Sequence, residues 1–355
     1  TRCSRDWSSD VCSSVLEGFA GYSLPDDLLS GTGLRIAQAI MLASPLFGSW
    51  LAFFVFGGEF PGLDFIPRLY TVHVLLIPLI FLALIGAHVG MVAYQKHTQY
   101  PGPGRTNKNV VGYPLMPVYI AKAGGFFFAV FGIIIAIGGL ITINPVWLFG
   151  PYVPNQVSAG SQPDWYMGFL DGAVRIMPAW EVYLWGHTLS LNLVVPAMLM
   201  PTIMILVVGA YPWIERWVTR GSDEEHHILD RPRNVATRTA LGAAFLSFYL
   251  LLFIASGDDI IATTFHLAIN NITYVFRVLV FVVPVLVFWS TKRIALALQR
   301  RDRDRLLHGE ETGNILRLPH GEFIEVHRHL SEHARAVIMS NPDLSPLQRS
   351  EEHTS

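Results

Sequence analysis

The chain is poor in charged residues and almost free of cysteine. Only 15% of its 355 residues are Asp, Glu, Lys or Arg, whereas 52% are hydrophobic and the mean hydropathy is +0.41. This composition excludes an ordinary soluble domain and indicates an integral membrane protein. Cys3 and Cys12 both lie near the start, which excludes a disulfide framework or thiolate metal site elsewhere. No basic stripe with interleaved aromatic residues is present, so no nucleic-acid partner is expected.

Charge is nearly absent from five windows of about twenty residues, the length that a helix needs to cross a hydrocarbon core of about 30 Å. We predict membrane-spanning helices at residues 69–94, 123–143, 191–210, 239–256 and 271–290. Arg277, in the last span, is expected to snorkel to the water boundary rather than pair inside the bundle. Two amphipathic pieces, at about 34–43 and 45–56, are too short to span. The sequence therefore predicts an all-α transmembrane bundle of about five spans, with two short interfacial helices and a cytoplasmic tail.

Basic residues are concentrated in alternate connections. The segments after the first and third spans and the start of the tail are rich in Lys and Arg, whereas residues 144–190 contain only Arg175. The loop between the fourth and fifth spans has no Lys or Arg and contains Asp258 and Asp259. By the positive-inside preference, these last two connections face outward and the C-terminus is cytoplasmic.

The two ends look unrelated to the rest of the chain. Residues 1–14 and 349–355 are polar, lack periodicity and resemble translated adapter sequence, so we interpret them as non-native; a genuine disordered tail is the alternative. Between them we expect a helix end with interfacial segments (15–57), a histidine-bearing helix, a loop and the next span (58–143), an outer loop (144–190), three C-terminal spans (191–299) and a cytoplasmic tail (300–348).

Two histidines lie deep in the first predicted span, where an imidazole requires a partner. His73 and His88 are fifteen residues apart, which on a helix means about 22 Å of rise and a phase difference of about 60°. They therefore face one side at opposite depths. Axial ligation of two haems across a bilayer would need this geometry. Two histidines that are packed and hydrogen-bonded between helices are the alternative.

The outer loop contains Gln162-Pro163-Asp164-Trp165-Tyr166. Pro-Asp-Trp-Tyr resembles the Pro-Glu-Trp-Tyr motif of the quinol-oxidising site in cytochrome b of the cytochrome bc complexes. The resemblance covers about residues 16–293, through the Arg68, His73 and His88 pattern, the GYSLP turn at 21–25 and the order of the spans. The loop and tail are most similar to the actinobacterial subunit, which oxidises menaquinol. The resemblance implies the fourth to eighth helices of that family, with the first two and most of the third missing.

Two b-type haems are implied by this resemblance. His73 would be an axial iron ligand of the outer, low-potential haem, and His88 of the inner, high-potential haem. Each haem would take its second ligand from the missing second helix, so the fragment is expected to be inactive by itself. Arg68 would face a propionate of the outer haem; a snorkelling arginine is the alternative.

The resemblance also implies a menaquinol site at the outer face. Asp164 would accept a quinol proton, as a carboxylate in a mostly apolar pocket can do; Asp is shorter than the family's Glu, so a water or Asp171 would assist. Capping of a short helix is the plainer role for Asp164. Tyr166 would donate a hydrogen bond or gate the pocket. The remaining expected quinone-binding residues are Pro163, Trp165, Tyr22, His187 and Thr188 at the outer face, and His97 at the inner face.

These features predict a quinol:cytochrome c oxidoreductase subunit of the respiratory chain, in a bacterial plasma membrane. The partners implied by the resemblance are a Rieske iron–sulfur subunit, a c-type cytochrome subunit, a second cytochrome b and, in actinobacteria, a terminal oxidase. A proton-coupled secondary transporter is an alternative, but it predicts inverted repeats that the sequence lacks. A non-catalytic membrane scaffold would leave the histidine pair and the Pro-Asp-Trp-Tyr loop unexplained.

Overall fold

The structure is a computed structural model that describes residues 14–112, 114–141, 146–156, 162, 164–218 and 227–341. Pro163, the C-terminal segment 349–355 and all of the segment 1–14 except Ser14 lie outside these residues. Five described helices are long and apolar enough to cross a membrane, which confirms the predicted number of spans. At most 17% of the apolar window of each is buried, so these side chains face outward, as expected in lipid. The five helices are Phe65–Gln95, Leu115–Leu140, Leu191–Val218, Pro232–Ala255 and Ile269–His308.

Three of the five spans contain a π-helical turn, and each turn contains a proline or ends two residues before one. The first span consists of α4 (Phe65–Thr71), the π-turn η1 (Val72–Leu76) and α5 (Ile77–Gln95). The Ile77 N–H bonds to the Val72 carbonyl, just before Pro78, which has no N–H to continue the α-helical ladder. The other π-turns are η2 (Leu115–Tyr119), which precedes α6 (Ile120–Leu140), and η4 (Val194–Leu199), between α9 (Leu191–Leu193) and α10 (Met200–Val218).

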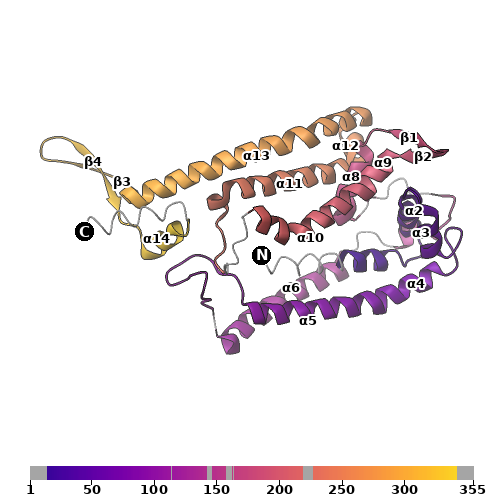
Figure 1. Cartoon of the computed structure of the whole chain (residues 1–355), viewed down its shortest axis with the longest axis horizontal. Helices are drawn as coiled ribbons and strands as arrows, with labels where there is room; N and C mark the ends of the chain where they lie inside the picture. The colour runs from indigo at the N-terminus through magenta and orange to yellow at the C-terminus, as the bar shows by residue number, and fades with distance from the viewer. Residues whose placement is uncertain are drawn as a thin grey trace. The chain divides into compact units, whose positions relative to one another are not determined.

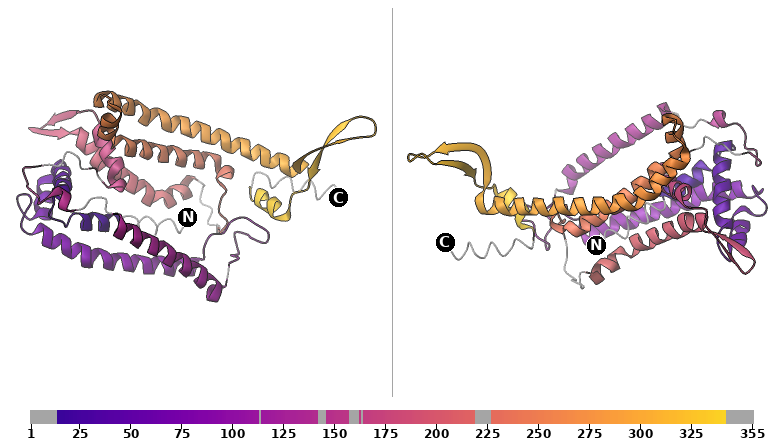
Figure 2. Two further views of the ribbon diagram at one scale, coloured as in Figure 1. Left: turned by 180° about the vertical axis from the view of Figure 1, so that it is seen from behind. Right: turned by 90° about the horizontal axis from the view of Figure 1, so that it is seen from above.

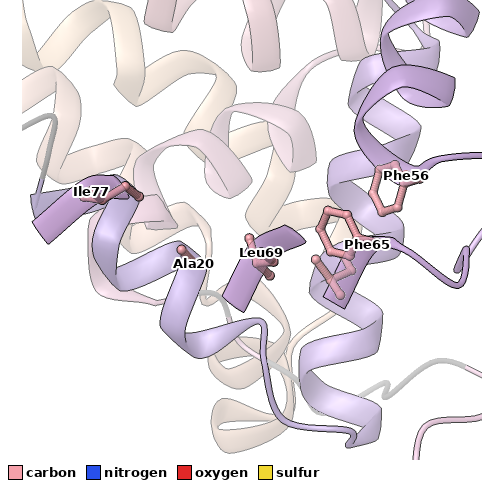
Figure 3. Packing of buried hydrophobic residues seen from close by; sticks show 6 residues of the cluster. Ala20, Phe56, Phe65, Leu69 and Ile77 are labelled. Carbon is pink, nitrogen blue, oxygen red and sulfur yellow. The ribbon is translucent and has the colours of Figure 1, made fainter. Parts of the chain in front are cut away.

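The chain divides into two compact units, each described here by itself. The first unit is formed by the chain up to Tyr94 and by Gly112–Ser222 and Tyr249–Leu279. Its apolar cluster joins the helix of residues 14–22 to α2 (Leu28–Leu42), α3 (Gly48–Phe56), α4 and α5 (Figure 3). In this cluster the rings of Phe56 and Phe65 stack, with their centroids 4.5 Å apart. The buried members are Ala20, Leu34, Phe56, Phe65, Leu69 and Ile77.

The short helices α2 and α3 correspond to the two predicted non-spanning pieces, although α2 begins six residues earlier than expected. Asp27 explains that start, because its carboxylate accepts a hydrogen bond from the Ser30 N–H at 2.7 Å and so caps the helix. Helix α3 ends at Gly57, whose φ of 73° favours glycine.

Glycines in α8 (Gly168–Ile176) allow that helix to lie directly against the end of α11 (Ala236–Ala255). A Cβ on Gly172 would lie 1.8 Å from the Leu252 carbonyl oxygen, and one on Gly168 would lie 2.6 Å from the Phe253 ring. The next turn of chain forms α12 (Asp258–Phe265), whose first turn carries Asp258 and Asp259. The two glycines, four residues apart on one face of α8, therefore set how closely α8 and α11 pack.

Arg277 does not snorkel as expected. It lies in α13 (Ile269–His308), and its Nε donates a hydrogen bond to the Ile176 carbonyl at 2.6 Å while its guanidinium lies over the Tyr274 ring. The carbonyl of Ile176, in the last turn of α8, has no partner within its own helix, so a cation is favourable there. The prediction failed because the arginine's partner is 101 residues away in the sequence.

Two β-hairpins depart from the all-α prediction, and both protrude from their surroundings (Figure 1, Figure 2). Strands β1 (Glu181–Leu184) and β2 (His187–Ser190) pair antiparallel in the first unit. The turn between them consists of Trp185 and Gly186, both with positive φ, as a two-residue hairpin turn requires. Strands β3 (Glu310–Arg317) and β4 (Phe323–Arg328) follow α13 in the tail.

The second unit is formed by Gln95–Val111, Asp223–Phe248 and Val280–Ser355. Buried Asp302 joins its parts by pairing with Arg231 and Arg233, each at 3.1 Å. The side chain of buried Gln99 closes the 99–111 loop through the Asn109 carbonyl and the Val111 N–H. The remaining helical elements are α7 (Val146–Phe149) and η3 (Trp165–Met167) in the first unit, and η5 (Pro232–Val235) and α14 (Glu332–Met339) in the second.

Candidate functional site

Asp164 and Tyr166 form a direct side-chain pair. The Tyr166 hydroxyl donates to Asp164 Oδ2 at 2.7 Å. Asp164 occupies the N-cap position of the short helix η3, but its side chain makes no capping hydrogen bond. The Met167 N–H bonds instead to the Asp164 backbone carbonyl. Asp164 therefore occupies the capping position that we expected as its plainer role, but its carboxylate does not cap the helix and accepts a hydrogen bond from Tyr166 instead.

The helix of residues 14–22 lies beside this pair. A Cβ on Gly18 would lie 3.3 Å from the Tyr166 hydroxyl oxygen, so glycine lets the tyrosine approach this helix closely. Burial and the hydrogen bond to Asp164 raise the pKa of Tyr166. Tyr22, outside the five spans, is close enough for its own pKa to rise to about 12, first through burial and then through the Asp164 charge. Both phenols therefore stay protonated at neutral pH and can act as hydrogen-bond donors.

Arg175 is surrounded by three carboxylates. Its Nε lies 2.7 Å from Asp171 Oδ2, and its Nη1 lies 2.8 Å from Asp258 Oδ1 and 3.2 Å from Asp259 Oδ1. Asp259 in turn accepts a hydrogen bond from Gln162 Nε2 at 2.9 Å. Burial raises the pKa of Asp171, and Arg175 partly offsets this rise. The cluster ties α8, α12 and the residue two positions before Asp164 together.

This cluster was not predicted, although a signal for it was present. Arg175 is the only Lys or Arg in residues 144–190, and Asp258-Asp259 is an acidic pair in a loop without Lys or Arg. A lone cation and a lone acidic pair, both assigned to the outer face, are natural partners. In the sequence, both features indicated only which loops face outward from the membrane.

His73 lies within the π-turn η1 and His88 on α5, and both are half-buried. The extra residue of a π-turn changes their phase difference from about 60° to about 40° in the opposite sense, so both still face one side. Nδ1 of His73 lies 3.1 Å from Glu17 Oε1. A Cβ on Gly21 would lie 2.5 Å from His73 Cε1, so only glycine permits this ring position.

The other predicted site residues are more scattered. Arg68 pairs with Asp64 at 3.5 Å and donates to the Phe54 carbonyl at 3.2 Å, and its side chain is about half exposed. Trp165 is exposed and packs edge to face with Tyr166. His187 and Thr188 are exposed on β2, and no hydrogen bond among the described residues joins them to Asp164 or Tyr166. His97 is exposed in the second unit, with Nδ1 2.8 Å from the Thr98 carbonyl.

Known proteins resemble this chain along most of its length. The family model described as cytochrome b(N-terminal)/b6/petB matches residues 11–151. A cytochrome bc1 complex cytochrome b subunit of Streptomyces coelicolor is 56% identical over 334 residues, which cover 94% of this chain and 61% of that protein. The subunit of the same name from Mycobacterium bovis is 50% identical over 328 residues, 91% of this chain and 59% of that protein.

The chain belongs to the cytochrome b family. It spans about three fifths of the length of these relatives. A solved structure titled hyperthermophilic respiratory Complex III has the same fold, with a TM-score of 0.54 at 20% identity over 83% of this chain and 70% of that one. The predicted helical membrane fold is thereby confirmed, with the two β-hairpins as additions to it.

The histidine helix, α4 to α5, has features that suit axial haem ligation. Its two imidazoles lie on one side at different depths, and Nδ1 of each is buried from solvent. The contact of His73 Nδ1 with Glu17 leaves Nε2 as the nitrogen for a metal, the usual division of roles in a ligand histidine.

Proposed function

We propose that this cytochrome b oxidises menaquinol at the outer face of a bacterial plasma membrane as part of a respiratory bc complex. One electron would pass to a Rieske iron–sulfur protein and the other would cross the membrane to a quinone at the inner face, near His97. The observation that carries the proposal is the Asp164–Tyr166 pair, 2.7 Å apart beside Tyr22, in a membrane chain with two same-sided histidines.

Oxidation of a quinol to a quinone releases two electrons and two protons. The Asp164 carboxylate would take a hydroxyl proton from the quinol. It is half-buried, and among the described residues Tyr166 is the one side chain that donates a hydrogen bond to it, so it has capacity to accept another. Tyr166 would hold the carboxylate in place and, by turning away, release Oδ2 for the quinol. Trp165 and Pro163 would shape the pocket, with His187 and Thr188 as further contacts.

Two b-type haems, when bound, would supply the one-electron transfer across the membrane. His73 would hold the outer, low-potential haem and His88 the inner, high-potential haem, each with a second ligand from outside this chain. Arg68 would form an ion pair with a propionate of the outer haem in place of its ion pair with Asp64. The protein would fix ligand orientation and the path of the protons.

The distribution of basic residues supports the proposed orientation, with residues 144–190 outside and the C-terminal tail in the cytoplasm. The proposed partners are a Rieske subunit, a c-type cytochrome subunit, a second cytochrome b and a terminal oxidase. The names of the relatives support assembly into a bc1 complex.

The test is the variant Asp164→Asn in membranes that contain the complete subunit. Loss of the proton acceptor should lower the rate of menaquinol oxidation about 10²- to 10⁴-fold, the usual contribution of a general base. The b-type haem bands of the reduced-minus-oxidised spectrum should be unchanged. Asp26→Asn, an exposed acid near Tyr22, is the matched control and should leave the rate unaltered.

Two results would contradict the proposal in different ways. Unchanged turnover in Asp164→Asn would remove that carboxylate from the mechanism while leaving the haem assignment intact. Absence of b-type bands from the unsubstituted protein would instead contradict the electron-transfer function itself, and a transporter would become the better reading.

A further inference from the structure

Glu17 is a carboxylate that neither the quinol pocket nor the haem ligands account for. It lies on the helix of residues 14–22, and its Oε1 is 3.1 Å from His73 Nδ1. Its second oxygen, Oε2, is shielded from solvent and makes no hydrogen bond among the described residues. The side chain as a whole is 34% exposed, so the shielded oxygen is the part of this carboxylate for which a nearby polar partner matters most. His73 is the partner that the geometry offers.

The position of the imidazole relative to Glu17 is fixed by a second contact. A Cβ at Gly21 would lie 2.5 Å from His73 Cε1 and 2.9 Å from Nε2, so the ring lies over bare backbone at this point. Residues 17 and 21 are one turn apart and share a face of the helix. One face of this helix therefore contacts the imidazole at two points. The Glu17 carboxylate lies beside Nδ1, and the backbone of Gly21, which has no side chain, lies beside Cε1.

The contact between Glu17 and His73 is close but is not aligned along the N–H direction, so Nδ1 makes no formal hydrogen bond in this arrangement. A small change in the tilt of the ring would align it. In metal-binding histidines, a carboxylate on the second nitrogen fixes the tautomer and the ring orientation and makes the ligating nitrogen more basic. A more basic axial ligand and a nearby negative charge both favour the oxidised iron.

We propose that Glu17 is the positioning residue for His73: it accepts the Nδ1–H, directs Nε2 to iron and lowers the midpoint potential of the outer haem. This inference rests on the proposed function, since it requires His73 to be a haem ligand. It adds a residue that distinguishes the two haems, because the potential of the haem held by His88 would not depend on Glu17.

The experiment is a redox titration of the b-type bands in membranes that contain the complete subunit. Glu17→Gln retains the shape and removes the charge. Loss of the carboxylate should shift the reduction equilibrium of the outer haem about tenfold toward the reduced form, a rise of about 59 mV for a one-electron couple. The inner haem of the same protein is the internal control, and Glu181→Gln, on the exposed strand β1, is the charge-matched control.

Glu17→Asp extends the test to a variant that keeps the charge but shortens the side chain. It should move the outer potential by less than Glu17→Gln does. If Glu17→Gln loses the outer haem while Glu17→Asp keeps it, the positioning role is supported. Equal shifts in both haems, no shift in either, or loss of both haems in both variants would overturn the inference. If the unsubstituted protein has no b-type bands, it is the proposed function that fails.

Discussion

Replacement of Arg175 by methionine should loosen the packing of α8 on α12. Methionine keeps much of the aliphatic volume and removes the guanidinium that contacts Asp171, Asp258 and Asp259. The side chain of Asp258 is only 5% exposed, so its charge would be left buried without the cation. Breaking a buried ion pair in this way costs about 3–5 kcal/mol. Since Arg175 is itself 25% exposed and the other two carboxylates reach water, the lower end of that range applies.

A loss of about 3 kcal/mol corresponds to a roughly 100-fold increase in local opening. Hydrogen–deuterium exchange of Gly168–Ile176 and Asp258–Phe265 measures it directly. Arg238→Met is the matched control, because Arg238 and its partner Asp230 are about half exposed and such pairs contribute at most about 1 kcal/mol. The double variant Arg175→Met, Asp258→Asn should recover part of the protection.

The effect should depend on pH in a defined direction. Burial gives Asp171 a higher pKa in the folded protein, so the folded state binds more protons and stability falls as pH rises from the unfolded pKa through the folded one. Removal of Arg175 takes away the contributions that lower this pKa. The loss of local stability in Arg175→Met, measured by hydrogen–deuterium exchange, should therefore be larger at neutral pH than at pH values near 4. Less than a tenfold change in exchange, or a change no larger than in Arg238→Met, would refute the reasoning.

Two further variants test the packing and the carboxylate–tyrosine pair. Gly172→Ala should destabilise the α8–α11 contact by at least about 1–3 kcal/mol, because the new Cβ would lie 1.8 Å from the Leu252 carbonyl oxygen, and thermal inactivation would detect it. Gly242→Ala on α11 has open space and should be neutral or stabilising; equal effects would contradict the packing argument. Tyr166→Phe removes the donor to Asp164 and should lower menaquinol oxidation about tenfold with the haem bands intact, whereas unchanged turnover would make that hydrogen bond incidental.

The spans were predictable because a single physical requirement, about twenty residues without charge, decides them. Their ends were not, since the observed helices begin as many as eight residues before the apolar windows, as at Leu115 and Pro232, where charges or prolines are tolerated near the water boundary. The β1–β2 hairpin was missed because residues 144–190 were interpreted as an outer loop. The alternating EVYL and HTLS around Trp-Gly were the available signal.

Contacts between distant residues were the least predictable part of the site. Asp164 and Tyr166 are two residues apart, and the motif that contains them assigned both to the expected quinol site but did not indicate the hydrogen bond between them. Arg175 and Asp258 are 83 residues apart, and Arg277 meets a backbone carbonyl 101 residues away. No local pattern records such a partner, because it depends on how α8 packs, and that packing follows from two glycines whose role is visible only when Leu252 and Phe253 lie against them.

The helix of residues 14–22 explains why two sites that look separate in the sequence would respond together. Because Gly18 and Gly21 have no side chains, the Tyr166 hydroxyl and the His73 ring can each lie close to the backbone of this one helix. A displacement of this helix would alter the Asp164–Tyr166 pair and the position of the His73 ring at once. A substitution at Glu17 that changes only the proposed outer haem potential, and leaves the rate of menaquinol oxidation unaltered, would therefore act through the imidazole contact itself and not through movement of the helix.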